Sequence, residues 1–242
     1  MSRNLAIDFG NTAIKMGVFE NERLLQDWRI AYDESPDILR IIEDYNVTMS
    51  IICSVVDRGG AIKQLLQEHT RCMVLRPETP VPFLNAYLTS ASLGMDRLAL
   101  VAAAFQAYPH NNNLVISVGT AVTYNVLTSN RTFRGGNITP GIGLRLRALN
   151  EFTDKLPLVD APGDTTLLGY DTESSIRSGV INGVAFEIDG FISAYKEQFK
   201  DINVFLTGGD ASILGRKLKN TTFADANLQL KGLNSILLYN AK

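Results

Sequence analysis

An aspartate beside a glycine turn opens the part of the chain that could do chemistry. Asp8 lies near the end of a short apolar run, residues 5–9, and the turn Gly10-Asn11-Thr12 follows it, with Lys15 shortly after. Glycine lets a backbone turn tightly, and successive N–H groups in such a turn can face a phosphate. An acid at the end of a strand can hold Mg²⁺ through waters. The same pattern also fits a hairpin whose aspartate caps its own turn.

A second acid stands at the expected start of a helix over residues 94–108. The segment reads Leu93-Gly94-Met95-Asp96-Arg97, so Asp96 follows a glycine closely and precedes an arginine. Transfer of a phosphoryl group needs an acceptor for the hydroxyl proton and cations near the charged oxygens. An acid in the first turn of a helix also serves simply to oppose the helix dipole. Both interpretations stay open at this point.

Two further glycine turns come later in the chain. When Gly119 is aligned with Gly10, the segment Leu114–Leu127 repeats the strand–turn–strand layout, with Ser117 on Asp8 and Ala121 on Thr12. Two copies that each head one half of the chain indicate a duplicated fold. The turn Thr207-Gly208-Gly209-Asp210 joins an expected strand to an expected helix, whose N-terminus favours negative charge. Either turn could also be purely structural.

The elements that must position these residues alternate between strands and helices. We expect strands at residues 5–9, 13–19, 49–56, 72–75 and 204–207, and helices from Ser35-Pro36-Asp37, at 61–68 and from Thr172 to about 199. Such alternation predicts an α/β protein with a largely parallel sheet. The small residues Gly179, Gly183 and Gly190 of the long helix look like close-packing positions.

Composition excludes several classes of function. The 242 residues carry 23 Lys+Arg against 25 Asp+Glu, so nothing suggests a partner made of nucleic acid. The apolar runs are too short to span a bilayer, which favours a cytoplasmic protein. Cys53 and Cys72 lie in apolar stretches and are expected to be reduced core residues. His69 and His110 have no partners at metal spacing, which argues against zinc.

The ordered set of motifs resembles type III pantothenate kinase, within the superfamily of acetate and sugar kinases, heat-shock ATPases and actin. The resemblance covers residues 5 to about 233. The residues that match the family pattern are Asp8-x-Gly10-Asn11-Thr12, Ser54-Val55-Val56, Leu93-Gly94-x-Asp96-Arg97, Gly119-Thr120-Ala121-x-Thr123, Gly135-Gly136-x-Ile138-x-Pro140-Gly141, Leu156-Pro157, Thr172 with Gly179, and Thr207-Gly208-Gly209-Asp210.

The resemblance implies ATP-dependent phosphorylation of pantothenate to 4′-phosphopantothenate, the first step of coenzyme A synthesis. It implies a duplicated ribonuclease H-like (actin-like ATPase) fold with mixed sheets, in two lobes at residues 1–112 and 113–242 with a cleft between them. It also implies a homodimer, with the helix from Thr172 as a dimer element.

The resemblance assigns a role to each site residue. Asp96 would be the general base, with Arg97 beside it as a substrate contact, and Asp8 would bind Mg²⁺. The nucleotide phosphates would be held by Asp8, Gly10, Asn11, Thr12, Lys15, Gly119, Thr120, Gly208 and Gly209. The pantothenate pocket would be formed by Tyr87, Gly94, Met95, Asp96, Arg97 and Thr172.

Three positions depart from the family pattern. The family usually has Asp where this chain has Ser117 and Asn125, and the segment from Tyr87 to Ser90 lacks the family's proline. The family's acid at position 117 helps hold a monovalent cation, K⁺ or NH₄⁺. A neutral serine binds such an ion less well, so the resemblance leaves cation dependence open. A kinase for another small hydroxyl metabolite and a non-catalytic nucleotide-binding regulator remain alternatives.

Overall fold

The computed structural model describes residues 3–34, 36–54, 60–163 and 165–241, which form two compact units. Unit 1 comprises Met1–His110, Leu127–Arg134 and Asn227–Lys242, and unit 2 comprises Asn111–Val126 and Gly135–Ala226. This division differs from the single boundary expected between residues 112 and 113. The chain returns to unit 1 twice, through a hairpin tip and through the C-terminal helix.

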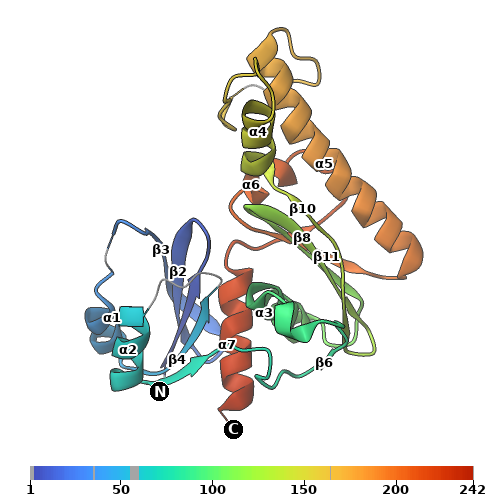
Figure 1. The fold of residues 1–242 in the computed structure, drawn as a ribbon. Coiled ribbons are helices and arrows are strands. Elements are labelled where there is room, and N and C mark those ends of the chain that lie inside the picture. Colours follow the sequence, from blue (N-terminus) through green and yellow to red (C-terminus); the bar gives the residue numbers. More distant parts are fainter. Residues whose placement is uncertain (1–2, 35, 55–59, 164, 242) are drawn as a thin grey trace. The chain divides into compact units, whose positions relative to one another are not determined.

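Unit 1 is built on a five-stranded mixed sheet with strand order β3-β2-β1-β4-β5 (Figure 1). Strands β1 and β2 and strands β2 and β3 are antiparallel, whereas β4 runs parallel to both β1 and β5. The elements of this unit are β1 (Arg3–Phe9), β2 (Ala13–Glu20), β3 (Arg23–Ala31), α1 (Ile38–Tyr45), β4 (Val47–Ser54), α2 (Gly60–His69), β5 (Arg71–Val74), β6 (Leu84–Asn85), the 3₁₀ turn η1 (Ser90–Ser92), α3 (Met95–Ala107) and α7 (Leu228–Asn240).

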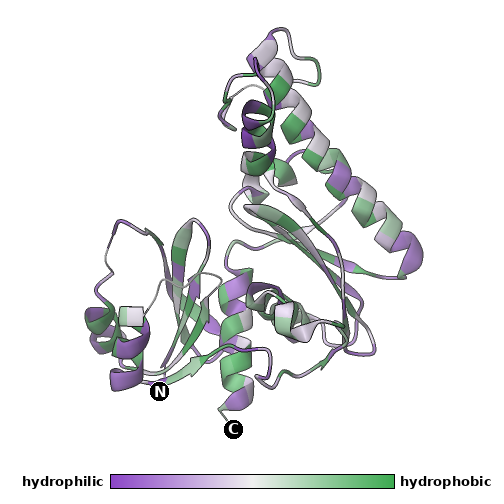
Figure 2. Ribbon diagram, in the orientation of Figure 1, coloured by the Kyte–Doolittle hydropathy of each residue, from purple (hydrophilic) through white to green (hydrophobic). Residues whose placement is uncertain are grey.

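Helix α7 joins unit 1 because it packs closely on α3. A Cβ added to Gly232 would overlap the backbone carbonyl of Ala99, so only a glycine allows this approach. A buried side-chain pair ties α7 to the sheet: Asn4 Nδ2 donates to Asn234 Oδ1 at 2.9 Å. Apolar and polar positions alternate along α7 (Figure 2). The sequence analysis proposed no helix here.

Unit 2 contains most of a second mixed sheet, of order β12-β11-β7-β8-β9-β6. Strand β11 runs parallel to β7 and to β12, and the short strand β10 is antiparallel to β8. The hairpin β8–β9 extends into unit 1, where β9 pairs with β6. The remaining elements are β7 (Asn113–Val118), β8 (Ala121–Thr128), β9 (Thr132–Gly135), β10 (Ile138–Pro140), α4 (Ile142–Glu151), α5 (Thr172–Gln198), β11 (Asn203–Thr207), α6 (Ala211–Gly215) and β12 (Phe223–Ala224).

The two sheets share one strand plan, which confirms the predicted duplication. The order β3-β2-β1-β4-β5 corresponds to β9-β8-β7-β11-β12, and β2 and β8 have the same alternation of buried and half-exposed positions. The second turn is one residue shorter, since β2 begins at Ala13 and β8 at Ala121. Ala121 therefore corresponds to Ala13, and the gapless alignment of Ala121 with Thr12 was wrong by one residue.

The predictions on strand direction, the first helix cap and the cysteines were confirmed in some cases and wrong in others. Both sheets contain antiparallel pairs, so the prediction of a largely parallel sheet was wrong. Asp37 is the N-cap of α1, where its side chain accepts from the N–H of Arg40; Ser35 lies outside the described residues. Both cysteines are free, as expected, although Cys72 is only half-buried. Across the described ranges, no helix combines the length and apolarity that crossing a bilayer requires.

Candidate active site

Asp8 is buried at the end of β1, between two neighbouring strands. Its register partners are Lys15 on β2 and Cys53 on β4, and only 3% of the aspartate is exposed. Burial raises the pKa of Asp8 from 3.8 to about 7 against the opposing charge of Lys15. The Asp96 carboxylate raises the pKa further, while a hydrogen bond from the Cys53 thiol lowers it. Two acids far apart in the sequence thus act on each other within unit 1.

The turn after Asp8 is held from both sides. The N–H of Gly10 donates to the carbonyl of Ala13 at 3.2 Å, and the hydroxyl of Tyr32 donates to the carbonyl of Gly10 at 2.6 Å. Asn11 and Thr12 at its tip are exposed, whereas Lys15 is half-buried. Because its backbone is fixed by these hydrogen bonds, such a turn can present backbone and side-chain donors to an anion.

Asp96 lies in the first turn of α3, with its carboxylate folded back over the start of the helix. Its Oδ1 accepts from the N–H of Arg97 at 2.9 Å. A Cβ at Gly94 would overlap this same oxygen, so the glycine leaves room for the carboxylate. Burial raises the pKa of Asp96, and the hydrogen bond and charge of Arg97 oppose the rise. A partly buried carboxylate of raised pKa takes up a proton more readily than an exposed one.

Arg97 is buried against two aromatic rings although it carries a full charge. Its exposed fraction is 4%, and its guanidinium carbon lies 5.3 Å from the ring centre of Tyr87 and 6.0 Å from that of Phe133. Contacts of this length are typical of cation–π interactions. Met95, the first residue of α3, is buried beside it in the core and contributes packing.

The surroundings of Asp8 fit a magnesium ion. Its Oδ1 is buried and has no hydrogen-bond partner among the described residues, so an oxygen ligand is available. The described residues contain no cluster of three or more His, Cys, Asp or Glu that could form a complete metal cage. Mg²⁺ commonly binds through one or two carboxylates and keeps water and substrate phosphates as its other ligands. One buried carboxylate is therefore compatible with this ion.

Unit 2 brings its own two glycine turns together. Ser117 pairs in register with Thr207, and the N–H of Asp210 donates to the carbonyl of Val118 at 3.2 Å. Gly208 adopts φ +104°, and a Cβ there would overlap the backbone of Val118, so a glycine is required. Helix α6 after this turn has only five residues, so its dipole is smaller than the sequence analysis assumed.

The remaining predicted residues of unit 2 occupy accessible positions. Thr120 is exposed, and Gly119 is half-exposed at the turn, where its N–H donates to the carbonyl of Ala121 at 3.0 Å. Thr172 is the exposed first residue of α5, behind the N-cap Asp171. Ser117 is half-buried, and the amide of Asn125 donates to the carbonyl of Val115 at 3.3 Å. At these two positions, where the family usually has Asp, this chain therefore has neutral side chains.

Within unit 1, therefore, the structure assembles Asp8, the first turn, Lys15 and Asp96 with its neighbours. Of the motifs quoted for the family, Val55 and Val56 lie outside the described residues. The sequence analysis missed Cys53, Tyr32 and Phe133 as neighbours of the site. Cys53 lies on the strand predicted over residues 49–56, but only the register of β1 with β4 places it beside Asp8. Nothing in the sequence alone signals Tyr32 or Phe133.

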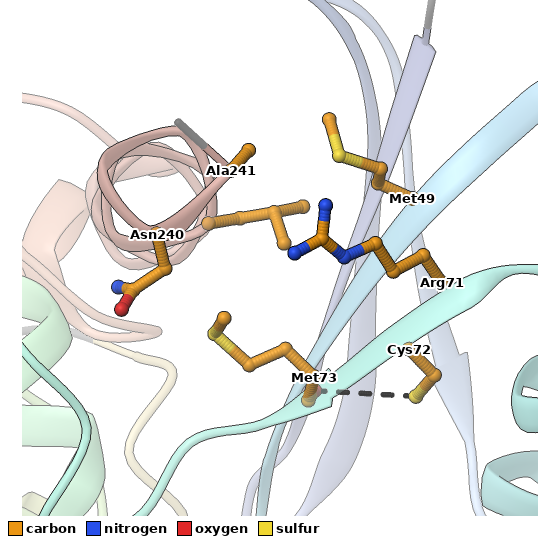
Figure 3. A pocket seen from close by; sticks show the side chains of 7 residues that line it. Met49, Arg71, Cys72, Met73, Asn240 and Ala241 are labelled. Carbon is orange, nitrogen blue, oxygen red and sulfur yellow. Dashed lines mark hydrogen bonds between the residues drawn. The ribbon is translucent and has the colours of Figure 1, made fainter.

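A cavity of about 200 Å³ lies elsewhere in unit 1, between β4, β5 and the end of α7 (Figure 3). Its lining contains none of the site residues predicted from the sequence. Cys72 Sγ lies 4.0 Å from the carbonyl of Met73, and Arg71 supplies the charged side chain of the lining. The cavity is therefore separate from the candidate active site. The lining residues are Met49, Arg71, Cys72, Met73, Leu237, Asn240 and Ala241.

Known structures of related fold support the architecture. A candidate Baf family transcriptional activator from Campylobacter jejuni matches with a TM-score of 0.63 at 20% identity, covering 98% of each chain. A ROK family glucokinase from Streptomyces griseus, in complex with glucose and AMPPNP, matches with a TM-score of 0.54 at 12% identity, covering 98% of this chain and 99% of the other. These likenesses confirm the predicted actin-like fold.

Sequence comparison identifies the family. The model of the type III pantothenate kinase family matches residues 4–194. A type III pantothenate kinase from Phocaeicola vulgatus is 42% identical over 240 residues, which is 99% of each chain. These matches include the Asp8 turn and the start of α3, where the structure places two interacting acids. The chain belongs to the type III pantothenate kinase family.

Proposed function

We propose that this protein transfers the γ-phosphoryl group of ATP to the primary hydroxyl of pantothenate, giving 4′-phosphopantothenate and ADP. The observation that carries this proposal is that Asp8 and Asp96 of unit 1 are close enough for the charge of Asp96 to raise the pKa of Asp8, which would give one site an acid for the metal ion and an acid for the proton. The relatives named type III pantothenate kinase support pantothenate as the acceptor.

Asp96 acts as the general base. The hydroxyl oxygen of the acceptor attacks the γ-phosphorus, the bond from that phosphorus to the β–γ bridging oxygen breaks, and the hydroxyl proton passes to Asp96. The hydrogen bond from the Arg97 N–H to Oδ1 orients the carboxylate. Arg97 contacts substrate oxygens, and Tyr87 and Gly94 line the acceptor pocket in unit 1.

Asp8 holds the divalent ion, for which Mg²⁺ is the proposed identity. When bound, this ion neutralises charge on the β- and γ-phosphates. The first turn, Gly10-Asn11-Thr12, donates to phosphate oxygens, and Lys15 adds a positive charge next to Asp8. In unit 2, the turns at Gly119-Thr120 and Gly208-Gly209 hold the rest of the nucleotide.

Monovalent cations are not expected to be required. Ser117 and Asn125 are neutral, and the Asn125 amide already donates to the carbonyl of Val115 and to Thr123 Oγ1, at 3.3 and 3.2 Å. An amide donor supplies part of the positive charge that an ion would otherwise bring to these oxygens. We therefore expect similar turnover in potassium, ammonium and sodium buffers.

A homodimer through α5 is also proposed. Nothing lies within 4 Å of a Cβ added at Gly179, Gly183 or Gly190, so the face that carries them is open. Phe186, 55% exposed, falls on the same side of the helix by its spacing. Small residues beside an exposed aromatic are suited to close packing with a second copy.

The decisive test is an assay of ADP release with ATP, Mg²⁺ and pantothenate, run beside a panel of sugars and polyols and with and without potassium. We expect turnover with pantothenate only. Asp96→Asn should lower kcat by about 10²-fold or more while leaving the circular dichroism spectrum unchanged. Asp27→Asn, an exposed change of the same charge, is the control. A protein that binds ATP yet releases no ADP above background with pantothenate would contradict the proposal.

Gly94→Ala tests the role of Asp96 without touching its charge. The backbone of Gly94, at φ −60° and ψ 126°, is open to alanine, so the fold should survive. The new Cβ would overlap Asp96 Oδ1 and displace the carboxylate, and we expect kcat to fall by about tenfold or more. Gly143→Ala is the matched control, since its Cβ would meet only Arg147 Nη1 at 3.7 Å. Equal activity of both variants would show that the position of this carboxylate does not matter.

A further inference from the structure

We infer that Phe133 is a positioning residue for Arg97, through which the tip of the β8–β9 hairpin controls the affinity for the acceptor substrate. The inference rests on the proposed function, in which Arg97 contacts pantothenate. Phe133 lies in the second half of the sequence and carries no reactive group. Its role follows from what its ring touches.

The Arg97 guanidinium lies against a platform of two rings. The rings of Tyr87 and Phe133 are within 9° of parallel, with centres 6.2 Å apart. The guanidinium carbon is 5.3 Å from the first centre and 6.0 Å from the second, so the three centres form a nearly equilateral triangle. The N–H donors of a guanidinium all point outward in its own plane. The two rings therefore restrict the position of the guanidinium and, with it, the directions of its N–H donors.

Backbone pairing sets the position of both rings. Strand β6 pairs with β9, with Asn85 opposite Phe133. The N–H of Ala86 donates to the carbonyl of Phe133 at 3.0 Å, and the N–H of Tyr87 donates to Asn85 Oδ1 at 3.1 Å. The pairing of β6 with β9 therefore positions both rings, because the strand that carries Phe133 also holds the segment that leads to Tyr87.

The hairpin tip contacts helix α3 at both ends. Phe133 meets Arg97 in its first turn, and the guanidinium carbon of Arg131 lies 5.8 Å from the ring centre of Phe105 near its end. Helix α3 also carries Asp96, so the tip helps hold the helix that presents both the base and the substrate contact. The aromatic character of Phe133 matters here in addition to its volume, because an aliphatic side chain has no π face to offer a cation.

A double-mutant cycle on pantothenate binding tests this role. Phe133→Leu keeps an apolar side chain and should raise the Kd for pantothenate, measured by calorimetry without ATP, by about tenfold, with the KM for ATP changed less than about twofold. In an Arg97→Gln background, where no cation remains, the same change should alter Kd by less than about twofold. Phe83→Leu is the matched control, because Phe83 belongs to the same core cluster and pairs with Phe105 instead.

The outcomes separate this inference from the proposed function. If Phe133→Leu and Phe83→Leu weaken binding equally, or if the effect of Phe133→Leu persists without Arg97, then Phe133 is a packing residue and the inference is wrong. If wild-type protein neither binds nor phosphorylates pantothenate, the proposed function is wrong. The coupling of Phe133 to Arg97 can then still be measured from the unfolding free energies of wild type, the two single variants and the double variant. If the two substitutions have additive effects on stability, the positioning role of Phe133 is wrong.

Discussion

At the scale of single residues, the main feature of the site is Asp8, a carboxyl group whose burial disfavours its charged form. Asp8 is almost completely covered, and its pKa rises to about 7 because desolvation and the Asp96 charge outweigh Lys15 and the Cys53 thiol. An acid held in this way has a strong preference for a proton or a cation. Ligand-free protein should therefore lose stability at this position, and binding of a divalent ion should restore it.

The free-energy cost of burying the charged Asp8 carboxylate predicts that the stability of the protein depends on pH. Because the folded pKa of Asp8 lies near 7 and the unfolded value is 3.8, the folded state binds more protons between these values. The stabilisation is full below about pH 4 and is lost as the pH rises through 7. Asp8→Asn should remove this dependence, making metal-free protein more stable than wild type at pH 8, by up to about 4 kcal/mol, while abolishing turnover.

Urea unfolding between pH 5 and 8 without divalent ions would measure this difference. Asp27→Asn, which removes one exposed carboxylate, should follow the wild-type profile. Magnesium with ATP should raise the Tm of wild type and not of Asp8→Asn. If the unfolding free energies of wild type and Asp8→Asn change with pH in the same way, then burial does not raise the pKa of Asp8.

Residue types made part of the site predictable. Asp8, Gly10 and Asp96 were identifiable because acids near glycines at element ends can do chemistry and because they fall in an ordered set of motifs that resembles the family pattern. Phe133 and Tyr32 were not, because a buried aromatic and a strand-end tyrosine have many structural uses. Their roles depend on contacts across long sequence separations, with the Arg97 guanidinium and with the carbonyl of Gly10.

At the scale of elements, the packing of α7 on α3 holds the helix that presents Asp96. The close approach at Gly232 brings α7 against the backbone of Ala99, three residues after Asp96. Gly232→Ala would gain about 1 kcal/mol in helix propensity. The overlap of its Cβ with that carbonyl should outweigh the gain, giving a net loss of stability of about 1–2 kcal/mol.

Chemical denaturation would test the prediction for Gly232, and Gly143→Ala, a helical glycine with ordinary surroundings, provides the comparison. Because the overlap pushes on α3, we also expect lower turnover under conditions where the variant is fully folded. A Gly232→Ala protein as stable as Gly143→Ala would show that the two helices can separate without cost.

The helices and strands were predictable where their periodicity was clear and missed where it was not. The long helix α5 begins at the expected Thr172 and ends one residue before Phe199. Helix α7 was missed because most of its residues are buried, so it lacks an amphipathic stripe, and because Gly232 interrupts it. Strand β3 was missed because its polar residues do not alternate regularly with apolar ones.

At the scale of the whole molecule, duplication gives two sheets of one plan that have since diverged in chemistry. The first copy keeps the acid, with Asp8 opposite Cys53, while the second has Ser117 opposite Thr207. The turn of the second copy is shorter by one residue. The first copy therefore carries an acid, to which the proposed function assigns the metal ion, and the second carries neutral side chains at the corresponding positions. The sequence showed the repeat, but only the strand register shows which residues correspond.

The proposed homodimer can be tested on the open face of α5. Gly183 lies at the middle of this face, where a Cβ meets no atom of the same chain within 4 Å. Gly183→Arg should therefore leave the fold intact by circular dichroism while placing bulk and charge where a second copy would pack. We expect wild type to be dimeric and this variant monomeric by light scattering. Gly60→Arg, which also enters open space but on α2, should remain dimeric. A dimeric Gly183→Arg protein would place the interface elsewhere, because an arginine cannot be buried unpaired in a closely packed contact without a large free-energy cost.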